Sequence, residues 1–322
     1  MAIVSRIRAL ARERRAVILA HNYQRPEIQD IADVVGDSLA LSREAARTDA
    51  DTIVLCGVHF MAETAAILSP TKTVLLPEAA AGCSLADTIT AEDVRRWKRE
   101  YPGAVVVAYV NTSAEVKAES DYCCTSGNAV DVVNAIASDQ EILFLPDFFL
   151  GAHVRRVTGR SNIRVWMGEC HVHAGITPQS LAAQRAANPG AELLIHPECG
   201  CATSVVEAMS AGDVSSDHAH ILSTEGMIRR PSASPADSFI VATETGILHR
   251  LRLIHPSRTF IPASEQAECR YMKLTTLESL ERSLETMTHR IVVPEAIANR
   301  ARLAIERMVS IGSPVLEPTG VR

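Results

Sequence analysis

The stretch AVVVAYVN at residues 104–111 is a short apolar run that ends in a polar aromatic residue and an asparagine. Two other runs end in polar residues in the same way, AVILAHN at 16–22 and AELLIHPE at 191–198. The polar markers of the three runs are spaced by 88 and 87 positions, at His21, Tyr109 and His196. The chain thus repeats itself about every 87 residues. This period is too long for a solenoid and indicates three homologous domains.

Each repeat holds two further apolar runs. The second runs are DTIVLCG (51–57), EILFLPD (141–147) and SFIVATE (238–244), and the third are KTVLLP (72–77), IRVWMG (163–168) and RTFIPA (258–263). Helical patterns lie between them, and Thr90 and Thr177, 87 residues apart, are predicted to cap two of these helices. Short continuous apolar strands that alternate with helices predict parallel sheets covered on both faces. We therefore expect an α/β protein: three homologous α/β/α sandwich domains with short parallel sheets, arranged with pseudo-threefold symmetry around a central site.

The expected domains follow the repeat and span 1–86, 87–173 and 174–289. The distance from the polar marker to the next serine turn is 17 residues in the first two repeats and 27 in the third. We therefore expect an insertion of about ten residues near 212–220. Two helical patterns follow, at 275–287 and 294–308. We expect the first to close the third domain and the C-terminal segment 290–322 to join the first domain.

Composition limits the possible functions. The chain has 322 residues, of which 47% are hydrophobic and 22% charged, a mixture that excludes a disordered protein. The net charge of −6 argues against binding nucleic acid or a membrane surface through bulk charge. No apolar run approaches the roughly 18 residues of a membrane span, and the N-terminal segment lacks the apolar core of a secretory signal. We expect a cytoplasmic protein with no nucleic-acid or membrane partner.

Three of the eight cysteines follow the repeat. Cys83, Cys170 and Cys269 each stand just past a third apolar run, spaced by 87 and 99 residues. Ligands in open α/β sheets bind beyond the carboxyl ends of strands, so threefold symmetry would point one thiolate from each domain at a common centre. Three thiolates without a fourth protein ligand fit an iron–sulfur cluster with one open iron, whereas structural zinc normally takes four ligands. Spacing alone leaves open the alternative of three buried cysteines produced by duplication.

The other five cysteines have no counterpart in the repeat, and we assign them no chemistry. They are Cys56, Cys123, Cys124, Cys199 and Cys201. A disulfide framework is not expected, because cytosolic thiols stay reduced and a chain of this length needs no such cross-links. The role of Cys199 and Cys201 is left open, since they lie close to the expected site.

Hydroxyl-rich turns are expected to open one helix in each repeat. They are GDSLALS (36–42), CTSGNAV (124–130) and LSTEGMI (222–228). Backbone N–H groups and hydroxyls at a helix start bind anions, although any one such turn is by default a plain N-cap. Ser38 and Ser126 lie 88 residues apart, in step with the repeat. We therefore interpret them as contacts for a carboxylate or a phosphate.

Together these segments resemble the quinolinate synthase family, the A protein of de novo NAD biosynthesis. The resemblance covers nearly the whole chain and rests on HNYQ (21–24), GDS (36–38), AYVNTSAEVKAESD (108–121), CCTSGNA (123–129), WMGECHVH (166–173), HPEC (196–199), STEGM (223–227) and CRYMK (269–273). No single motif is specific, but their combination is. One departure is the insertion before Ser223, which replaces the compact turn common in the family.

The resemblance implies a [4Fe-4S] cluster held by Cys83, Cys170 and Cys269, with one open iron that acts as a Lewis acid. It implies a condensing transferase that joins iminoaspartate to dihydroxyacetone phosphate and releases phosphate and water to give quinolinate. The implied catalytic residues are Glu198, His196, Tyr23, Tyr109 and His21. The implied substrate-binding residues are His21, Asp37, Ser38, Tyr109, Asn111, Ser126, His173, His196, Glu198, Ser223 and Thr224. It also suggests transient contact with an aspartate-oxidising enzyme.

Other functions remain open from the residues alone. One is a different hydro-lyase that uses an open-iron cluster on a small hydroxy acid and needs no phosphate site. Another is a non-catalytic iron–sulfur sensor, which gives no reason for the triplicated histidine and tyrosine set. A zinc protein is the simplest alternative to any cluster, and metal content after anaerobic purification distinguishes the two.

Overall fold

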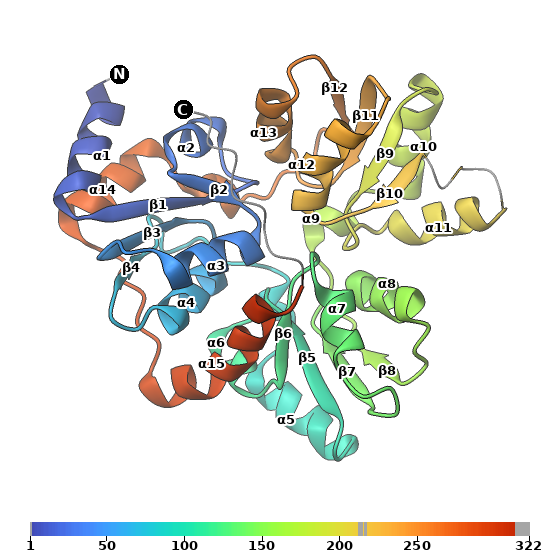
Figure 1. Cartoon of the computed structure of the whole chain (residues 1–322), viewed down its shortest axis with the longest axis horizontal. Helices are drawn as coiled ribbons and strands as arrows, with labels where there is room; N and C mark the ends of the chain where they lie inside the picture. Colours follow the sequence, from blue (N-terminus) through green and yellow to red (C-terminus); the bar gives the residue numbers. More distant parts are fainter. Residues whose placement is uncertain (1, 212–214, 216–217, 313–322) are drawn as a thin grey trace.

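Three four-stranded parallel sheets form the framework of the protein (Figure 1). The computed structural model describes residues 2–211, 215 and 218–312. In spatial order the first sheet contains β2 (Val34–Gly36), β1 (Ala16–His21), β3 (Thr52–Cys56) and β4 (Thr73–Leu75). The second contains β6 (Tyr122–Cys124), β5 (Val105–Tyr109), β7 (Ile142–Leu145) and β8 (Ile163–Val165). The third contains β10 (Ala219–Ile221), β9 (Glu192–Ile195), β11 (Ser238–Ala242) and β12 (Thr259–Pro262). The three sheets share one strand order, and the expected α/β class is confirmed.

The central strands are buried on both faces, as their continuous apolar runs require. Every residue of β3, β7 and β9 is buried. The strand with the polar marker occupies the same place in each sheet, so His21 ends β1, Tyr109 ends β5 and His196 directly follows β9. The shared strand order therefore brings three equivalent strand ends to one cavity.

Helices pack against the sheets, and the two with predicted caps begin where the sequence indicates. In the first third they are α1 (Ala2–Glu13), α2 (Pro26–Ile31), α3 (Ser38–Arg47), α4 (His59–Leu68) and the short η1 (Ala86–Thr88). In the second they are α5 (Ala91–Glu100), α6 (Ala114–Ala118), α7 (Ala129–Asn134), α8 (Phe148–Thr158) and α9 (His171–Ala174). In the third they are α10 (Pro178–Ala187), α11 (Ala202–Ala211), α12 (Thr224–Ala233), α13 (Ile247–Ile254) and the short η2 (Met272–Leu274). Thr90 and Thr177 cap α5 and α10 as predicted, since each side chain accepts a hydrogen bond from the backbone N–H three residues on.

The last two helices, α14 (Leu277–Thr286) and α15 (Glu295–Ser310), return to the first two repeats (Figure 1). We expected the first of them to close the third repeat, but α14 packs against α1, with Leu280 and Leu284 in one core with Ile7. An amphipathic pattern predicts a buried face but not the element that covers it. The helix α15 packs against α3 and α4 and also against α6 and β6, so it lies between the first and second repeats.

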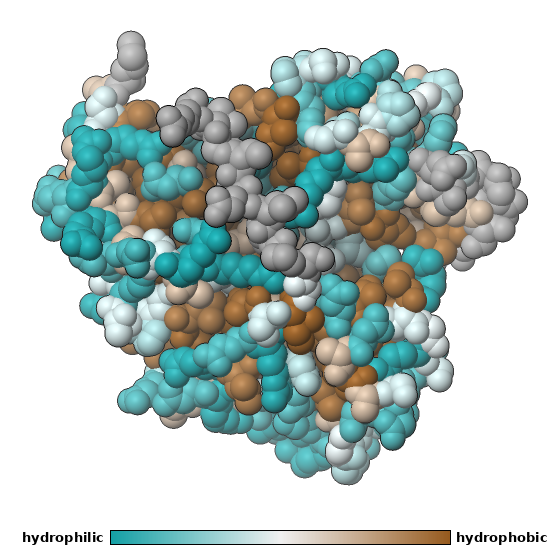
Figure 2. Space-filling model, viewed as in Figure 1, coloured by the Kyte–Doolittle hydropathy of each residue, from teal (hydrophilic) through white to brown (hydrophobic). Residues whose placement is uncertain are grey.

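The predicted insertion near 212–220 includes residues 212–214 and 216–217, which lie outside the described residues. The domain boundaries stay predictions. Within the described residues, no helix combines the length and apolar character needed to cross a membrane. Figure 2 shows hydrophilic residues spread over one face of the molecule, with hydrophobic residues in smaller separate areas.

Asn128 fastens the end of α15 to the second repeat. Its Nδ2 donates to the carbonyl oxygens of Met308 (2.9 Å) and Ile311 (3.0 Å), and its Oδ1 accepts from the backbone N–H of Thr125 (2.8 Å). Asn128→Ala leaves these groups unpaired, so we expect a loss of about 1–3 kcal/mol of unfolding free energy in chemical denaturation. The matched control is Asn299→Ala on the exposed face of α15. A loss for Asn128→Ala no larger than that of the control would contradict the fastening role.

Candidate active site

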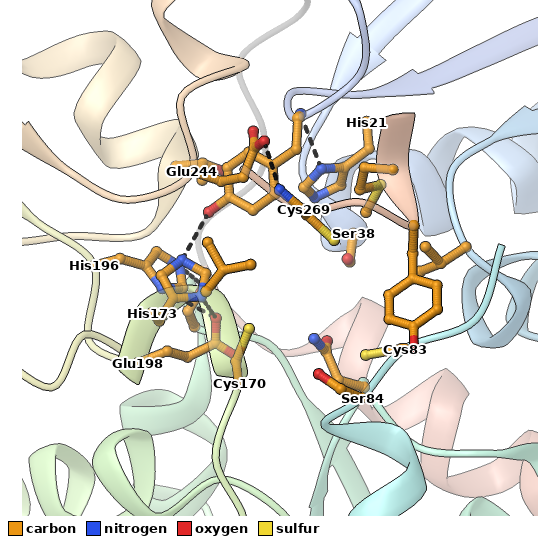
Figure 3. A pocket seen from close by; sticks show the side chains of 18 of the residues that line it. His21, Ser38, Cys83, Ser84, Cys170, His173, His196, Glu198, Glu244 and Cys269 are labelled. Carbon is orange, nitrogen blue, oxygen red and sulfur yellow. Dashed lines mark hydrogen bonds and ion pairs between the residues drawn. The ribbon is translucent and has the colours of Figure 1, made fainter. Parts of the chain in front are cut away.

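A cavity lies where the strand ends of the three sheets meet (Figure 3). It contains about 720 Å³ of empty space, counting its open mouth. All but one of the sequence-predicted site residues line it, namely His21, Tyr23, Asp37, Ser38, Cys83, Tyr109, Asn111, Ser126, Cys170, His173, His196, Glu198, Thr224 and Cys269. The exception is Ser223, whose side chain accepts from the backbone N–H of Gly226 (3.3 Å) and so caps α12. Contact of Ser223 with a substrate stays a prediction.

The three predicted ligand thiols share one local environment. Each stands at the start of a short helical turn: Cys83 before η1, Cys170 before α9 and Cys269 before η2. Backbone N–H groups two and three residues further on face each sulfur and favour its thiolate form, from Leu85 and Ala86, from Val172 and His173, and from Tyr271 and Met272. N–H groups directed at sulfur are one way in which proteins tune iron–sulfur centres. The threefold repeat therefore extends to the surroundings of the sulfur atoms.

Burial keeps these thiols protonated unless a metal binds them. It raises the pKa of Cys83 to about 12, and it raises the pKa of Cys170 and of Cys269 above the ordinary thiol value. A metal ion deprotonates a coordinating thiol outright. None of the three takes part in a disulfide. The cavity therefore offers three soft donors whose ionisation would depend on a bound metal.

The spacing of the donors suits a cluster at the thiols better than a single ion. Figure 3 shows the three thiols on different sides of the cavity. Among the described residues, the three donors close enough to share one ion are His173, His196 and Glu198, whose ligand atoms lie within 4.8 Å of one another. In a [4Fe-4S] cluster each thiolate binds its own iron, so separated thiols fit such a cluster. They do not fit a compact tetrahedral zinc site.

Glu198 is a buried carboxylate held beside two histidines. Its Oε2 lies 3.3 Å from Nδ1 of His173 and 3.2 Å from Nδ1 of His196. Burial alone would raise the pKa of Glu198, but the two histidines and Tyr109 outweigh it and bring this pKa below its ordinary value. Among the described residues, no hydrogen bond of good geometry reaches Oε1. An ionised carboxylate with an unengaged oxygen is suited to accept a proton from a substrate.

Hydroxyl groups hold the far nitrogens of both histidines. Nε2 of His173 lies 2.9 Å from Oγ1 of Thr243, which in turn lies 2.5 Å from the hydroxyl of Tyr23. Nε2 of His196 lies 3.1 Å from Oγ of Ser126. The two imidazole rings stack with their centroids 4.9 Å apart. Polar groups thus run from Tyr23 through the central carboxylate to Ser126, and the two Nδ1–Oε2 links in this row are close contacts without hydrogen-bond geometry.

His21 presents an uncharged N–H donor to the cavity. Its Nδ1 accepts a hydrogen bond from the backbone N–H of Tyr23 (3.2 Å), so Nε2 carries the ring hydrogen. Burial, reinforced by the nearby His196, lowers the pKa of His21 to about 3. Burial also lowers the pKa of His173 to about 4. Both rings are therefore neutral at neutral pH.

Acid should destabilise the metal-free protein through these two rings. The unfolded chain protonates both near pH 6.5, whereas the folded pKa values of His21 and His173 are about 3 and about 4. The unfolded state therefore binds more protons below pH 6.5, and the stability present above that pH is lost as the pH falls toward 4. We expect Tm, followed by circular dichroism, to fall across this window and to fall less steeply in His21→Gln. Equal slopes in the two proteins would contradict the assignment to His21.

Neutral donors, and not cations, are available for anionic groups. None of the described lysines and arginines lines the cavity. Asp37 caps α3 by accepting from the N–H of Ala40 (2.8 Å), which places Ser38 at the first position of that helix. Asn22 Nδ2 donates to Oγ1 of Thr224 (3.2 Å) and joins the first repeat to the start of α12 in the third. Hydroxyls and helix starts of this kind suit carboxylate or phosphate oxygens.

Two buried acids, Asp147 and Glu244, follow β7 and β11 and were not among the predicted site residues. Glu244 lines the cavity. Burial, with the nearby Glu198, raises the pKa of Asp147 well above its ordinary value. The two acids end the second apolar runs, 141–147 and 238–244. Their shared position, at the end of the second apolar run of a repeat, is the signal that could have identified them.

Cys199 and Cys201, to which no chemistry was assigned, form a disulfide. The turn after β9 brings their Cα atoms to 5.2 Å, within the range that this bond requires. The expectation of reduced thiols is therefore wrong at this pair, because a local turn and not a framework of loops forms the bond. The other described cysteines are free.

Comparison with known proteins places the chain among relatives. Residues 5–310 match the family described as quinolinate synthetase A protein. A protein of Mycobacterium sp. strain KMS named quinolinate synthase is 59% identical over 308 residues, which cover 96% of this chain and 91% of that protein. Proteins of the same name from Mycolicibacterium paratuberculosis and Mycobacterium tuberculosis are each 57% identical over 308 residues, covering 96% of this chain and 88% of each relative. The chain therefore belongs to the quinolinate synthetase A protein family.

Proposed function

We propose that the protein is a quinolinate synthase of de novo NAD biosynthesis, a condensing transferase. It joins iminoaspartate to dihydroxyacetone phosphate and releases inorganic phosphate and two waters, which leaves quinolinate. The observation that carries this proposal is the meeting of three free thiols, one from each repeat, with the compact group of His173, His196 and Glu198 in one cavity. Family membership and the relatives named quinolinate synthase support it.

Cys83, Cys170 and Cys269 are the residues that would hold a [4Fe-4S] cluster. When bound through only three thiolates, such a cluster supplies a Lewis acid at its open iron. The protein contributes the N–H groups that face the sulfurs and a cavity wall that includes apolar Val58, Phe60 and Met272.

Glu198 is the proton acceptor with the best geometry. Closing the ring requires removal of protons from carbon and delivery of protons to departing hydroxyl groups. The ionised carboxylate can take the first, while Nδ1 of His173 and of His196, at 3.3 and 3.2 Å, can exchange protons with it. The hydroxyls of Thr243 and Ser126 hold the outer nitrogens and keep both rings turned toward the carboxylate.

Tyr23 and Tyr109 act as neutral proton donors. Burial raises the pKa of both phenols well above the ordinary tyrosine value, so each keeps its proton at neutral pH. Both line the cavity, one from the first repeat and one from the second. They donate to the carbonyl and hydroxyl oxygens of the triose part of the substrate.

The anionic ends of the substrates bind to neutral donors. His21 offers Nε2–H, and Asn111, which lines the cavity, carries amide N–H donors on Nδ2. The hydroxyls of Ser38, Ser126 and Thr224 lie at or near helix starts. These groups hold the two carboxylates and the phosphate until phosphate leaves.

The test is product formation by protein that is purified without oxygen and reconstituted with iron and sulfide. Iminoaspartate hydrolyses readily, so an aspartate-oxidising enzyme, which we also propose as a transient partner, generates it in the assay. We expect quinolinate and phosphate in equal amounts, and neither without the triose phosphate. Dehydration of a small hydroxy acid without phosphate release would instead identify the alternative hydro-lyase. A bound cluster without any turnover would favour a sensor, and bound zinc in place of iron would overturn the cluster.

A further inference from the structure

Glu244 is a buried acid whose hydrogen bonds converge on the segment that carries Cys269. It follows β11 and is 1% exposed. Its Oε1 accepts from the backbone N–H of Cys269 (3.0 Å) and lies 2.9 Å from Nζ of Lys273. Its Oε2 accepts from the backbone N–H of Gly246 (2.7 Å). Figure 3 shows Glu244 beside Cys269 at the cavity wall.

Lys273 carries the same connection into the first repeat. Its Nζ donates to the backbone carbonyl oxygen of Tyr23 (2.5 Å), and its own carbonyl oxygen accepts from Nε of Arg25 (2.8 Å). The ammonium group therefore binds a carboxylate of the third repeat and the backbone of a cavity residue of the first. One buried pair thus contacts both the segment of a cluster ligand and the segment of a proposed proton donor.

Gly246 shows how closely these groups approach. A Cβ atom at this glycine would lie 2.7 Å from Nζ of Lys273, 2.7 Å from the carbonyl oxygen of Tyr23 and 2.8 Å from Oε2 of Glu244. Real Cβ atoms essentially never show contacts under 3.0 Å, and the carbonyl oxygen of Tyr23 belongs to the backbone and cannot move aside as a side-chain end can. On its other side, the carbonyl oxygen of Gly246 accepts from Nε2 of Gln29 in the first repeat (2.9 Å). The junction of the first and third repeats therefore has no room for a side chain here.

We propose that Glu244 and Lys273 are positioning residues that fix the Cys269 thiol and Tyr23 relative to each other across this junction. A buried ion pair adds little stability compared with apolar groups of the same size. Stability alone therefore does not explain why this pair lies in the cavity wall. Some groups hydrogen-bond to metal-ligating residues without binding the metal themselves. Their removal commonly changes metal affinity or activity about 10–100-fold. The inference rests on the proposed cluster but not on the identity of the substrates.

Glu244→Gln is the first test. The glutamine amide has only one acceptor oxygen, and its NH₂ group would face a donor. At least one of the three contacts, with the N–H of Cys269, the N–H of Gly246 or Nζ of Lys273, is therefore lost. We expect the reconstituted cluster to bleach in air about 10-fold faster than in the parent protein and kcat to fall about 10–100-fold, with KM little changed. Asp237→Asn, at an exposed ion pair with Arg258 in the same repeat, is the matched control and should change neither.

The double variant Glu244→Gln, Lys273→Met separates positioning from stability. It leaves no lone buried charge, so we expect the free energy of unfolding to recover. If the pair positions Cys269 and Tyr23, rapid bleaching and low kcat persist in this variant. Recovery of cluster lifetime and kcat together with stability would overturn the proposal, as would single variants that match the control. Cluster lifetime is measured without substrate, so failure of the proposed quinolinate synthesis would leave this test intact.

Discussion

Cys170→Ser should lose the brown absorbance of an iron–sulfur cluster and most of its bound iron after anaerobic reconstitution. A serine hydroxyl is a poor substitute for a soft thiolate toward iron, and two thiolates from separate repeats cannot hold the cluster alone. Quinolinate formation should fall at least about 10³-fold, because the Lewis acid is lost with the metal. Iron analysis, the visible spectrum and the rate of product formation measure the three effects.

The matched control for this variant is Cys56→Ala. Cys56 is more deeply buried than Cys170, lies in β3 and does not line the cavity. It should keep its iron and its activity. Full iron content in Cys170→Ser would show that this thiol is not a ligand. Iron loss in Cys56→Ala would show that replacing a buried cysteine disturbs the fold, and would contradict the assignment of the loss to ligation.

Glu198→Gln should lower kcat by about 10²–10⁴-fold, the usual contribution of a general base, while the cluster remains. The amide keeps the shape of the carboxylate but cannot accept a proton. Because its neighbours His173 and His196 lose their anionic partner, we also expect the pH profile of kcat/KM to change shape. Rates from about pH 6 to 9, with the visible spectrum as a check on the cluster, test this prediction.

Glu92→Gln, at an exposed glutamate of α5 paired with Arg95, is the matched control for Glu198→Gln. It removes one carboxylate of the same kind far from the cavity lining and should leave kcat unchanged. Unchanged kcat in Glu198→Gln would rule out its role as the base. Loss of the cluster in that variant would show instead that Glu198 supports the metal site.

The sequence predicts well the features that recur at the same place in each repeat. His21, Tyr109 and His196 meet because equivalent strands occupy the same place in each sheet, and a parallel sheet sends their carboxyl ends to one edge. Cys83 and Cys170 follow the same rhythm. The apolar runs also predict three strands of each sheet, since burial on both faces leaves no alternation of polar residues. They miss the three-residue strands β2, β6 and β10.

The sequence predicts poorly what depends on contacts between repeats. The amphipathic helix α14 has an apolar face that would suit several neighbours, and only the folded chain shows that α1 covers it. Lys273 reaches Glu244 at a separation of 29 residues and Tyr23 at a separation of 250, numbers that no periodic pattern encodes. The Cys199–Cys201 bond depends on the shape of one turn.

The distribution of one thiol to each repeat also has a consequence for biogenesis. A nascent chain that has emerged from the ribosome only through its second repeat exposes Cys83 and Cys170 but not Cys269. Iron delivered at that stage would meet an incomplete set of donors, and the helix that lies between the first and second repeats, α15, has yet to be translated. Loading of the proposed cluster would therefore have to follow synthesis of the third repeat, which would make cofactor insertion a late event in the maturation of this protein.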